Sequence, residues 1–158
     1  MVNGEMQVKE KEKLKIVEKV SRECLAGRVR LLSRVITGIY DRAMRSHGIK
    51  VNQAGILIML SMAEKPTPGD ICRRFQMEKS TVSRNIERMR RKGWIESGKG
   101  DGPSQVFTVT PKGKKLLAEL YSKWEKAQKE ASEMLGEEGV KAVHLLIERL
   151  GRVKRNGL

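Results

Sequence analysis

Apolar residues recur along much of this chain at the spacing of an α-helix, in which positions three and four apart share one face. The clearest case is the segment from Ser80 to Lys92, with the sequence STVSRNIERMRRK. Val82, Ile86 and Met89 fall on one face, which is typical of a helix packed on a small core. The opposite face carries hydroxyl groups first and guanidinium groups after them, from Ser80, Thr81, Arg84, Arg88 and Arg91. The pattern predicts an amphipathic helix whose polar face meets a negatively charged partner.

A shorter helix is predicted immediately before this one. The sequence from Thr67 to Asp70 has the pattern of a capping box with aspartate in the usual Glu/Gln place and proline in the first turn. The helix then covers residues 68–75, and a turn over 76–79 leads into the central helix, which ends at Lys92-Gly93. Its inward positions are Ile71, Cys72 and Phe75. Two short helices joined by a tight turn, the second of them basic, form the helix-turn-helix pattern.

The segments on either side complete this lobe. Upstream, Asn52 is predicted to cap a helix that Lys65-Pro66 ends. Downstream, residues 94–97 and 105–109 predict two short strands around the glycine-rich stretch 98–104, a hairpin of the kind called a wing when it follows a helix-turn-helix. The buried face of the upstream helix is predicted to be Ile56, Leu57, Met59 and Leu60.

The N-terminal part predicts a long helix from about residue 13 to residue 46, preceded by frayed residues 1–12. Its apolar residues form two neighbouring stripes that cover about half of the circumference, more than one neighbouring helix requires. We therefore expect this helix to lie between several others, including helices of a second subunit. The stripes are Val17, Val20, Cys24, Leu31, Val35 and Ile39, and Leu25, Val29, Leu32 and Ile36.

The C-terminal part predicts two more helices, separated at Gly136. The first is capped by Thr110-Pro111 and carries apolar residues at alternating spacings of three and four, as in a coiled-coil seam. These are Leu117, Leu120, Trp124, Ala127, Ala131 and Met134, and the second helix, over about 137–153, repeats the pattern with Val140, Val143, Ile147 and Leu150. The terminal helices can pack within one chain or between two, and the wide arc of the first helix favours two.

The fold predicted from these patterns is mainly α with a small β-hairpin. It has a flexible N-terminus over residues 1–12, a winged helix-turn-helix lobe over 51–110, and a helical dimerisation region formed by 13–50 and 111–155.

The net charge of the chain indicates what kind of partner it binds. Lys and Arg together number 33 against 19 Asp and Glu in 158 residues, for a net charge of +14. Such an excess indicates a polyanion, either nucleic acid or an anionic membrane surface. The longest apolar run, residues 56–60, is far too short to span a membrane, and the polar N-terminus does not have the pattern of a signal peptide. Two cysteines do not make a disulfide framework, so we expect a cytoplasmic protein.

Five segments in this order resemble the MarR-type winged-helix transcription regulators. They are VNQAGILIML from residue 51, TPGDICRRF from 67, STVSRNIERM from 80, RKGWI from 91 and VTPKG from 109, and the resemblance covers about residues 28–150. It implies a homodimer formed by the terminal helices, with two winged-helix lobes bound to double-stranded DNA at a pseudo-palindromic operator. It also implies release of DNA when a small molecule or an oxidant reaches the junction between lobe and dimer region.

The predicted DNA-binding residues are Ser80, Thr81, Ser83, Arg84, Arg88, Arg91 and Lys99. Those near the start of the central helix are expected at base edges, with Arg84 as the candidate for guanine, and Arg88 and Arg91 at phosphates. The wing of the resembled family usually carries Asp-x-Arg, whose arginine enters the minor groove. Here the wing is KGDGPSQ from residue 99, which keeps Asp101 and has no arginine, so Lys99 is the cation at its tip.

Three residues are candidates for an effector site. Arg28 and Arg42 lie within the apolar arc of the first helix, where each needs a partner. That partner is either a carboxylate on another helix or subunit, such as Asp41, or a small anionic or aromatic effector. Cys24 occupies the first helix, as does the reactive cysteine of the peroxide-sensing branch of the family. Its place on an apolar stripe is equally typical of a small hydrophobic residue.

Other kinds of function receive little support from the sequence. His47 and His144 have no cysteine or carboxylate at metal-ligand spacing. There is also no nucleophile–base pattern or phosphate loop, so neither a metal, a cofactor nor an enzymatic activity is expected. The interpretation is a sequence-specific transcriptional regulator, and specifically a repressor. The alternatives are an architectural or low-specificity DNA-binding protein without an effector, and a winged helix used for protein contacts.

Overall fold

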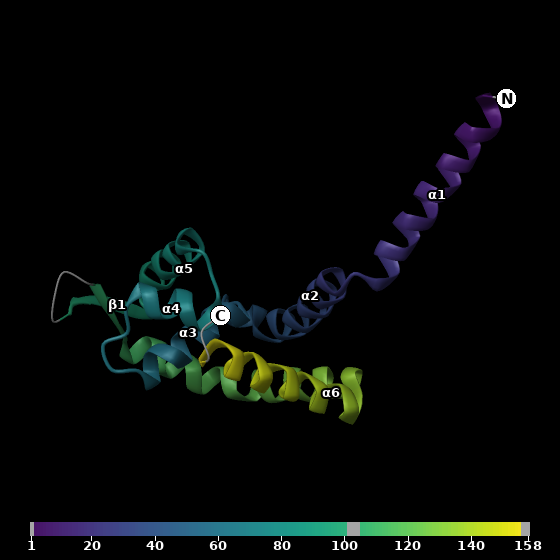
Figure 1. The fold of residues 1–158 in the computed structure, drawn as a ribbon. Helices are drawn as coiled ribbons and strands as arrows, with labels where there is room; N and C mark the ends of the chain where they lie inside the picture. The colour runs from purple at the N-terminus through teal and green to yellow at the C-terminus, as the bar shows by residue number, and fades with distance from the viewer. Residues whose placement is uncertain (1, 101–104, 156–158) are drawn as a thin grey trace. The chain divides into compact units, whose positions relative to one another are not determined.

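The structure is a computed structural model that describes residues 2–100 and 105–155, with side chains from residue 12 to residue 151 outside the same gap. The chain divides into two compact units, Met1–Gly38 and Ile39–Leu158. The first unit contains helix α1 (Val2–Glu23) and most of α2 (Leu25–Met44) (Figure 1). The second contains the end of α2 and then the 3₁₀ turn η1 (Arg45–His47), α3 (Val51–Met62), α4 (Pro68–Phe75), α5 (Lys79–Arg91), β1 (Ile95–Lys99), β2 (Gln105–Val109) and α6 (Pro111–Arg155).

The first unit differs in two ways from the predicted single helix over 13–46. The helix begins at Val2, earlier than the predicted residue 13, and includes residues 2–12, for which a frayed segment was predicted. It is also interrupted at Cys24, between α1 and α2. The side chain of Arg28 explains the interruption, because its Nε donates to the carbonyl oxygen of Arg22 over 2.9 Å. That carbonyl would otherwise accept from a backbone N–H in the next turn of the helix.

The apolar stripes of this unit are exposed. Leu25 is 76% exposed, and Val20, Val29 and Leu31 are each more than half exposed. The predicted burial of these stripes among several helices is therefore not seen within the unit. A wide apolar arc left open to solvent is the feature that a partner would have to cover.

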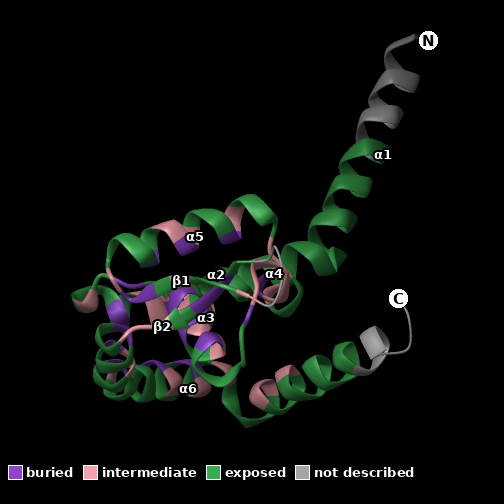
Figure 2. Cartoon of the chain, turned by 90° about the vertical axis from the view of Figure 1, so that its left-hand side faces the viewer, coloured by how far each residue is buried: buried purple, intermediate pink, exposed green. Residues whose placement is uncertain are grey.

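The second unit contains the core of the lobe. Its buried side chains come from the inner faces of α3, α4, α5 and the hairpin (Figure 2), and α6 adds Leu116 and Leu120. The fully buried residues include Ile56, Leu57, Ile71, Val82, Met89 and Phe107. The predicted inward faces of α3, α4 and α5 thus meet in one core, with Met59, Cys72 and Phe75 partly buried against it.

Helix α3 begins at Val51, and the predicted capping by Asn52 is wrong. Asn52 lies in the first turn of the helix and is exposed. The free N–H groups at this end are satisfied by two other side chains. Asp41 Oδ1 accepts from the Val51 N–H over 2.8 Å, and Gln53 Oε1 accepts from the Lys50 N–H over 3.2 Å. A carboxylate from α2 has taken the place of the local cap.

Helix α4 covers the predicted residues and begins with the predicted capping box. The Asp70 N–H donates to Thr67 Oγ1 over 3.3 Å, and the Thr67 N–H donates to Asp70 Oδ2 over 2.8 Å. The hydroxyl and backbone N–H of Thr67 lower the pKa of the Asp70 carboxyl, because they donate to its charged form. The box is therefore formed with aspartate ionised, which also suits the positive end of the helix dipole.

The hairpin is confirmed, with β1 beginning one residue later and ending two residues later than predicted. The strands are antiparallel, with Ile95 opposite Val109 and Lys99 opposite Gln105. Asp101 and the rest of the wing tip lie outside the described residues. The predicted break at Gly136 is also confirmed, since this residue has φ 69° and ψ 168° inside α6.

The seam of α6 is only partly covered in the single chain. Leu120, Ala127 and Ala131 are buried as predicted, whereas Trp124 is 42% exposed and Met134 48% exposed. After Gly136, Ile147 and Leu150 are more than half exposed. None of the helices in the described part of the chain has an apolar stretch of the length that a membrane crossing needs.

Candidate nucleic-acid interface

Helix α5 is held on the lobe by its apolar face, as predicted. Val82, Ile86 and Met89 are buried in the core, while the opposite face is open to solvent. The end of the helix is fixed by the backbone of the following turn. The Trp94 N–H donates to the carbonyl oxygen of Met89 over 3.0 Å, and Gly93 adopts a positive φ of 72° there. The polar face of α5 is therefore carried by a rigid part of the structure.

The structure places six of the seven predicted DNA-binding residues along this one helix. The seventh, Lys99, is exposed at the end of β1. Ser80, Ser83, Arg84, Arg88 and Arg91 are exposed, and Thr81 is half-buried. Arg84 Nη2 lies 3.4 Å from Thr81 Oγ1, one turn towards the helix N-terminus. A hydroxyl-rich first turn followed by arginines is thus presented on one side of the helix, as its sequence predicted.

Glu87 changes the electrostatics of this face in a way that the sequence analysis did not consider. Its carboxylate oxygens lie 3.3 Å from Arg90 Nη1 and 2.8 Å from Arg91 Nε. The i,i+3 and i,i+4 spacing of these residues would have been enough to predict both pairs. In contrast, neither Arg84 nor Arg88 has an ion-pair partner in the described part of the chain. Glu87 therefore offsets part of the positive charge of Arg91, whereas, among the described residues, Arg84 and Arg88 have no carboxylate that would compete with another anion.

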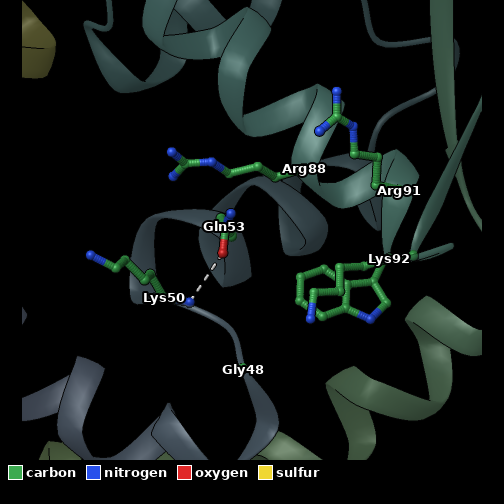
Figure 3. Close-up of a pocket in the computed structure, with 7 residues that line it drawn as sticks. Gly48, Lys50, Gln53, Arg88, Arg91 and Lys92 are labelled. Atoms are coloured by element: carbon green, nitrogen blue, oxygen red, sulfur yellow. Dashed lines mark hydrogen bonds between the residues drawn. The ribbon is translucent and has the colours of Figure 1, made fainter.

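A second feature missed from the sequence is a cavity of about 320 Å³ at the C-terminal end of α5 (Figure 3). Its lining joins residues from about 45 positions apart in the chain, and no local sequence pattern connects them. They are Gly48, Lys50, Gln53, Arg88, Arg91, Lys92 and Trp94.

The three effector candidates have different surroundings. Arg42 Nη2 lies 2.6 Å from Glu130 Oε1 on α6, which confirms the prediction of a carboxylate on another helix. Arg28 instead donates to the backbone carbonyl of Arg22, so within the single chain its partner is a carbonyl oxygen rather than a carboxylate. Both arginines are exposed, as is Cys24, whose expected burial is not seen in the single chain. Among the described residues, no group of three or more histidine, cysteine or acidic side chains is placed so that it could hold a metal ion.

A helix-turn-helix followed by an antiparallel hairpin defines a winged-helix protein. Within that class, residues 47–102 match the model of the MarR family. The fold also matches that of the M. tuberculosis transcriptional regulator MosR, solved in complex with DNA. The two chains are 27% identical with a TM-score of 0.72, and the match covers 85% of this chain and 98% of MosR. Residues 47–102 are thus similar to the MarR family, and the resemblance predicted from the sequence is confirmed by these matches.

Two further relatives extend the comparison. The HTH-type transcriptional regulator BilQ of Clostridioides difficile (strain CD3) is 29% identical over 96 residues, a match that covers 57% of this chain and 65% of BilQ. The chain thus matches slightly less than two thirds of that relative. The structure of Bordetella bronchiseptica BpsR, which concerns regulation of its DNA binding by 6-hydroxynicotinic acid, shares the fold with a TM-score of 0.72 at 17% identity. The structural match covers 82% of this chain and 95% of BpsR.

Proposed function

We propose that this protein is a sequence-specific DNA-binding transcriptional regulator, a repressor, and that it catalyses no reaction. The observation that carries the proposal is the exposed basic face of α5, fixed to the lobe by Val82, Ile86 and Met89. Residues 73–92, which include this helix, hold eight cations against two carboxylates. A helix with these properties in a winged helix-turn-helix inserts its first turns into the major groove of DNA.

Arg84 and Arg88 have different roles in this proposal. Arg84 lies near the N-terminus of α5, where side chains reach base edges, and a guanidinium group can bind guanine O6 and N7 together. Arg88 lies one turn further along and binds a phosphate. Ser80, Thr81 and Ser83 accompany Arg84, while Arg91 and Lys99 add phosphate contacts.

Replacing each arginine separately tests this division of roles. Arg84→Ala is expected to cost about 1–3 kcal/mol of binding free energy on the preferred site and to relax the preference at one base pair. Arg88→Ala is expected to weaken binding to all sequences alike and to lower the salt dependence by about one unit. Fluorescence anisotropy on specific and random duplexes at several salt concentrations distinguishes the two. Identical behaviour of the two variants on both duplexes would show that the roles are not divided.

We further propose that the protein acts as a homodimer on a pseudo-palindromic operator. The support for this is the apolar surface that the terminal helices expose. In α1 and α2 it includes Val20, Leu25 and Leu31, and in α6 it includes Trp124 and Ile147. Two-fold pairing of such helices would cover this surface and would place one α5 in each of two successive major grooves.

An effector is the remaining part of the proposal. BpsR is a structural neighbour whose DNA binding is regulated by an aromatic acid, 6-hydroxynicotinic acid. In this chain Arg28 would bind the carboxylate of such an acid, and the exposed Cys24 would be the site reached by an oxidant. Arg42 is a separate candidate, which would have to exchange Glu130 for such a carboxylate. Titration of the DNA complex with a panel of aromatic acids tests the role of Arg28. Release from wild type at concentrations that leave Arg28→Ala bound is expected, and an equal response of both proteins contradicts it.

A further inference from the structure

The cavity at the C-terminal end of α5 lies wholly within the second unit and is formed by three segments. The 3₁₀ turn is followed by Gly48, the start of α3 provides Lys50 and Gln53, and the end of α5 provides Arg88 and Arg91. Lys92 and Trp94 close it from the turn after α5. In Figure 3 the Lys50 and Arg88 side chains extend to the same side, Arg91 points away from them, and the Gln53 oxygen is joined to the Lys50 N–H.

The charged residues of this lining are all basic. Four of its seven residues are Lys50, Arg88, Arg91 and Lys92, and none is acidic. Arg91 is paired with Glu87, which is not part of the lining. For Lys50, Arg88 and Lys92, no carboxylate lies within ion-pair distance in the regions that the structure describes. Three uncompensated positive charges around one cavity repel each other, and an anion bound between them removes that repulsion.

The polar groups of the wall are fixed. Gln53 is only 6% exposed, and its Oε1 accepts from the Lys50 N–H over 3.2 Å. Its amide oxygen accepts this one hydrogen bond, and its NH₂ group offers two donors. Trp94 is 5% exposed and is held by its backbone bond to Met89. A Cβ at position 48 would lie 3.8 Å from Lys92 Nζ, so this ammonium group lies close to the backbone at the cavity's edge.

We propose that this cavity binds a single phosphate-class oxyanion. The charged side chains around it are all donors, which suits a ligand with several acceptor oxygens and more than one negative charge. A carboxylate, with two oxygens and one charge, would leave part of this donor set unused. The phosphate can belong to the DNA backbone or to a free phosphate in solution. The first case rests on the proposed function, whereas the second does not.

The cavity shares Arg88 and Arg91 with the DNA-binding face of α5 proposed above. A free phosphate in the cavity would therefore draw these guanidinium groups away from DNA and lower its affinity. A backbone phosphate in the cavity would instead make Lys50 and Lys92 part of the DNA contact. The two sources predict opposite effects of the cavity on DNA binding, so they can be separated.

Trp94 provides a direct reporter of occupancy. The chain has two tryptophans, and Trp124 lies outside the cavity lining, so Trp124→Phe leaves Trp94 as the fluorophore. In this background, titration with inorganic phosphate at constant ionic strength is expected to give a saturable change that potassium chloride does not give. Lys50→Gln and Lys92→Gln are each expected to raise the phosphate Kd about tenfold, since each removes a charge-assisted hydrogen bond. Lys114→Gln, an exposed lysine of α6, is the matched control.

The same variants test the DNA source. If the cavity holds a backbone phosphate, Lys50→Gln lowers the slope of log K against log salt by about one unit and Lys114→Gln does not. If the ligand is free phosphate, the titration saturates, the slope is unchanged, and phosphate displaces DNA from wild type more effectively than from Lys50→Gln. Either result supports the proposal. Absence of a saturable response to phosphate together with an unchanged slope overturns it. The phosphate titration requires no DNA, so its outcome is independent of whether the protein proves to be a regulator.

Discussion

Phe107→Ala is expected to lower the free energy of unfolding of the lobe by about 3–5 kcal/mol, the usual cost of removing a buried phenylalanine side chain. This is a large part of the 5–15 kcal/mol that stabilises a typical domain. Phe107 is 2% exposed and belongs to the core formed with α3, α4 and α5. Its backbone N–H also donates to the carbonyl oxygen of Pro66 over 3.1 Å, which joins the hairpin to the loop before α4.

Urea denaturation followed by circular dichroism measures this effect. Phe107→Leu is the control, because it keeps an apolar side chain in the same place and leaves a smaller cavity, and we expect it to cost less than half as much. If Phe107→Ala lowers the free energy of unfolding by less than about 1 kcal/mol, the ring does not fill the core beneath α5.

Gly113→Ala is expected to destabilise the lobe by about 3 kcal/mol or more, at the upper end of the range for overpacking. A Cβ at this position would lie 2.2 Å from the carbonyl oxygen of Trp94 and 2.7 Å from Val109 Cγ1. The first of these atoms belongs to the backbone and cannot move away by a side-chain rotation. Position 113 also lies at the centre of a network, since Thr110 Oγ1 accepts from the Gly113 N–H over 3.1 Å and donates to the Gly93 carbonyl over 2.7 Å.

The destabilisation by Gly113→Ala is also expected to disturb the DNA-binding face, because Gly93 and Trp94 lie in the turn that follows α5. Thermal and urea denaturation of Gly113→Ala should therefore show lower stability, and a binding assay on DNA should show lower affinity even below the unfolding transition. Gly151→Ala is the matched control. Apart from the neighbouring backbone of its own helix, no atom that the structure describes lies within 4 Å of a Cβ placed at that glycine, so the stability of this variant should be unchanged or raised by up to about 1 kcal/mol. Equal stability of the two alanine variants would contradict the close approach at Gly113.

The parts of the fold predicted correctly are those specified by neighbouring residues. The capping box of Thr67 and Asp70 set the start of α4, the apolar spacing of Val82, Ile86 and Met89 set the inner face of α5, and Gly136 marked the break in α6. Each of these signals lies within one or two helical turns, so local sequence is sufficient. The family resemblance was found in the same segments, because they combine the helix-turn-helix with the hairpin.

The incorrect or missing predictions depend on contacts between distant residues. Asn52 is a good capping residue, yet Asp41 from the preceding helix satisfies the first N–H of α3 and the helix starts two residues earlier than such a cap predicts. The interruption at Cys24 follows from the side chain of Arg28, which no periodicity shows. In the candidate site, the arginines were predicted because they lie on one helix. The cavity that joins Lys50 to Trp94 was not, since only the folded lobe brings these residues together.

The central claim is that α5 reads a DNA sequence, and selection of bound DNA from a random pool tests it most directly. The enriched duplexes are expected to contain two inverted half-sites about one helical turn apart, bound roughly 10³-fold or more tightly than random DNA at the same salt concentration. Equal affinity for the enriched and the starting pools would contradict sequence reading and would identify an architectural DNA-binding protein instead. Binding to neither pool would favour a winged helix used for protein contacts.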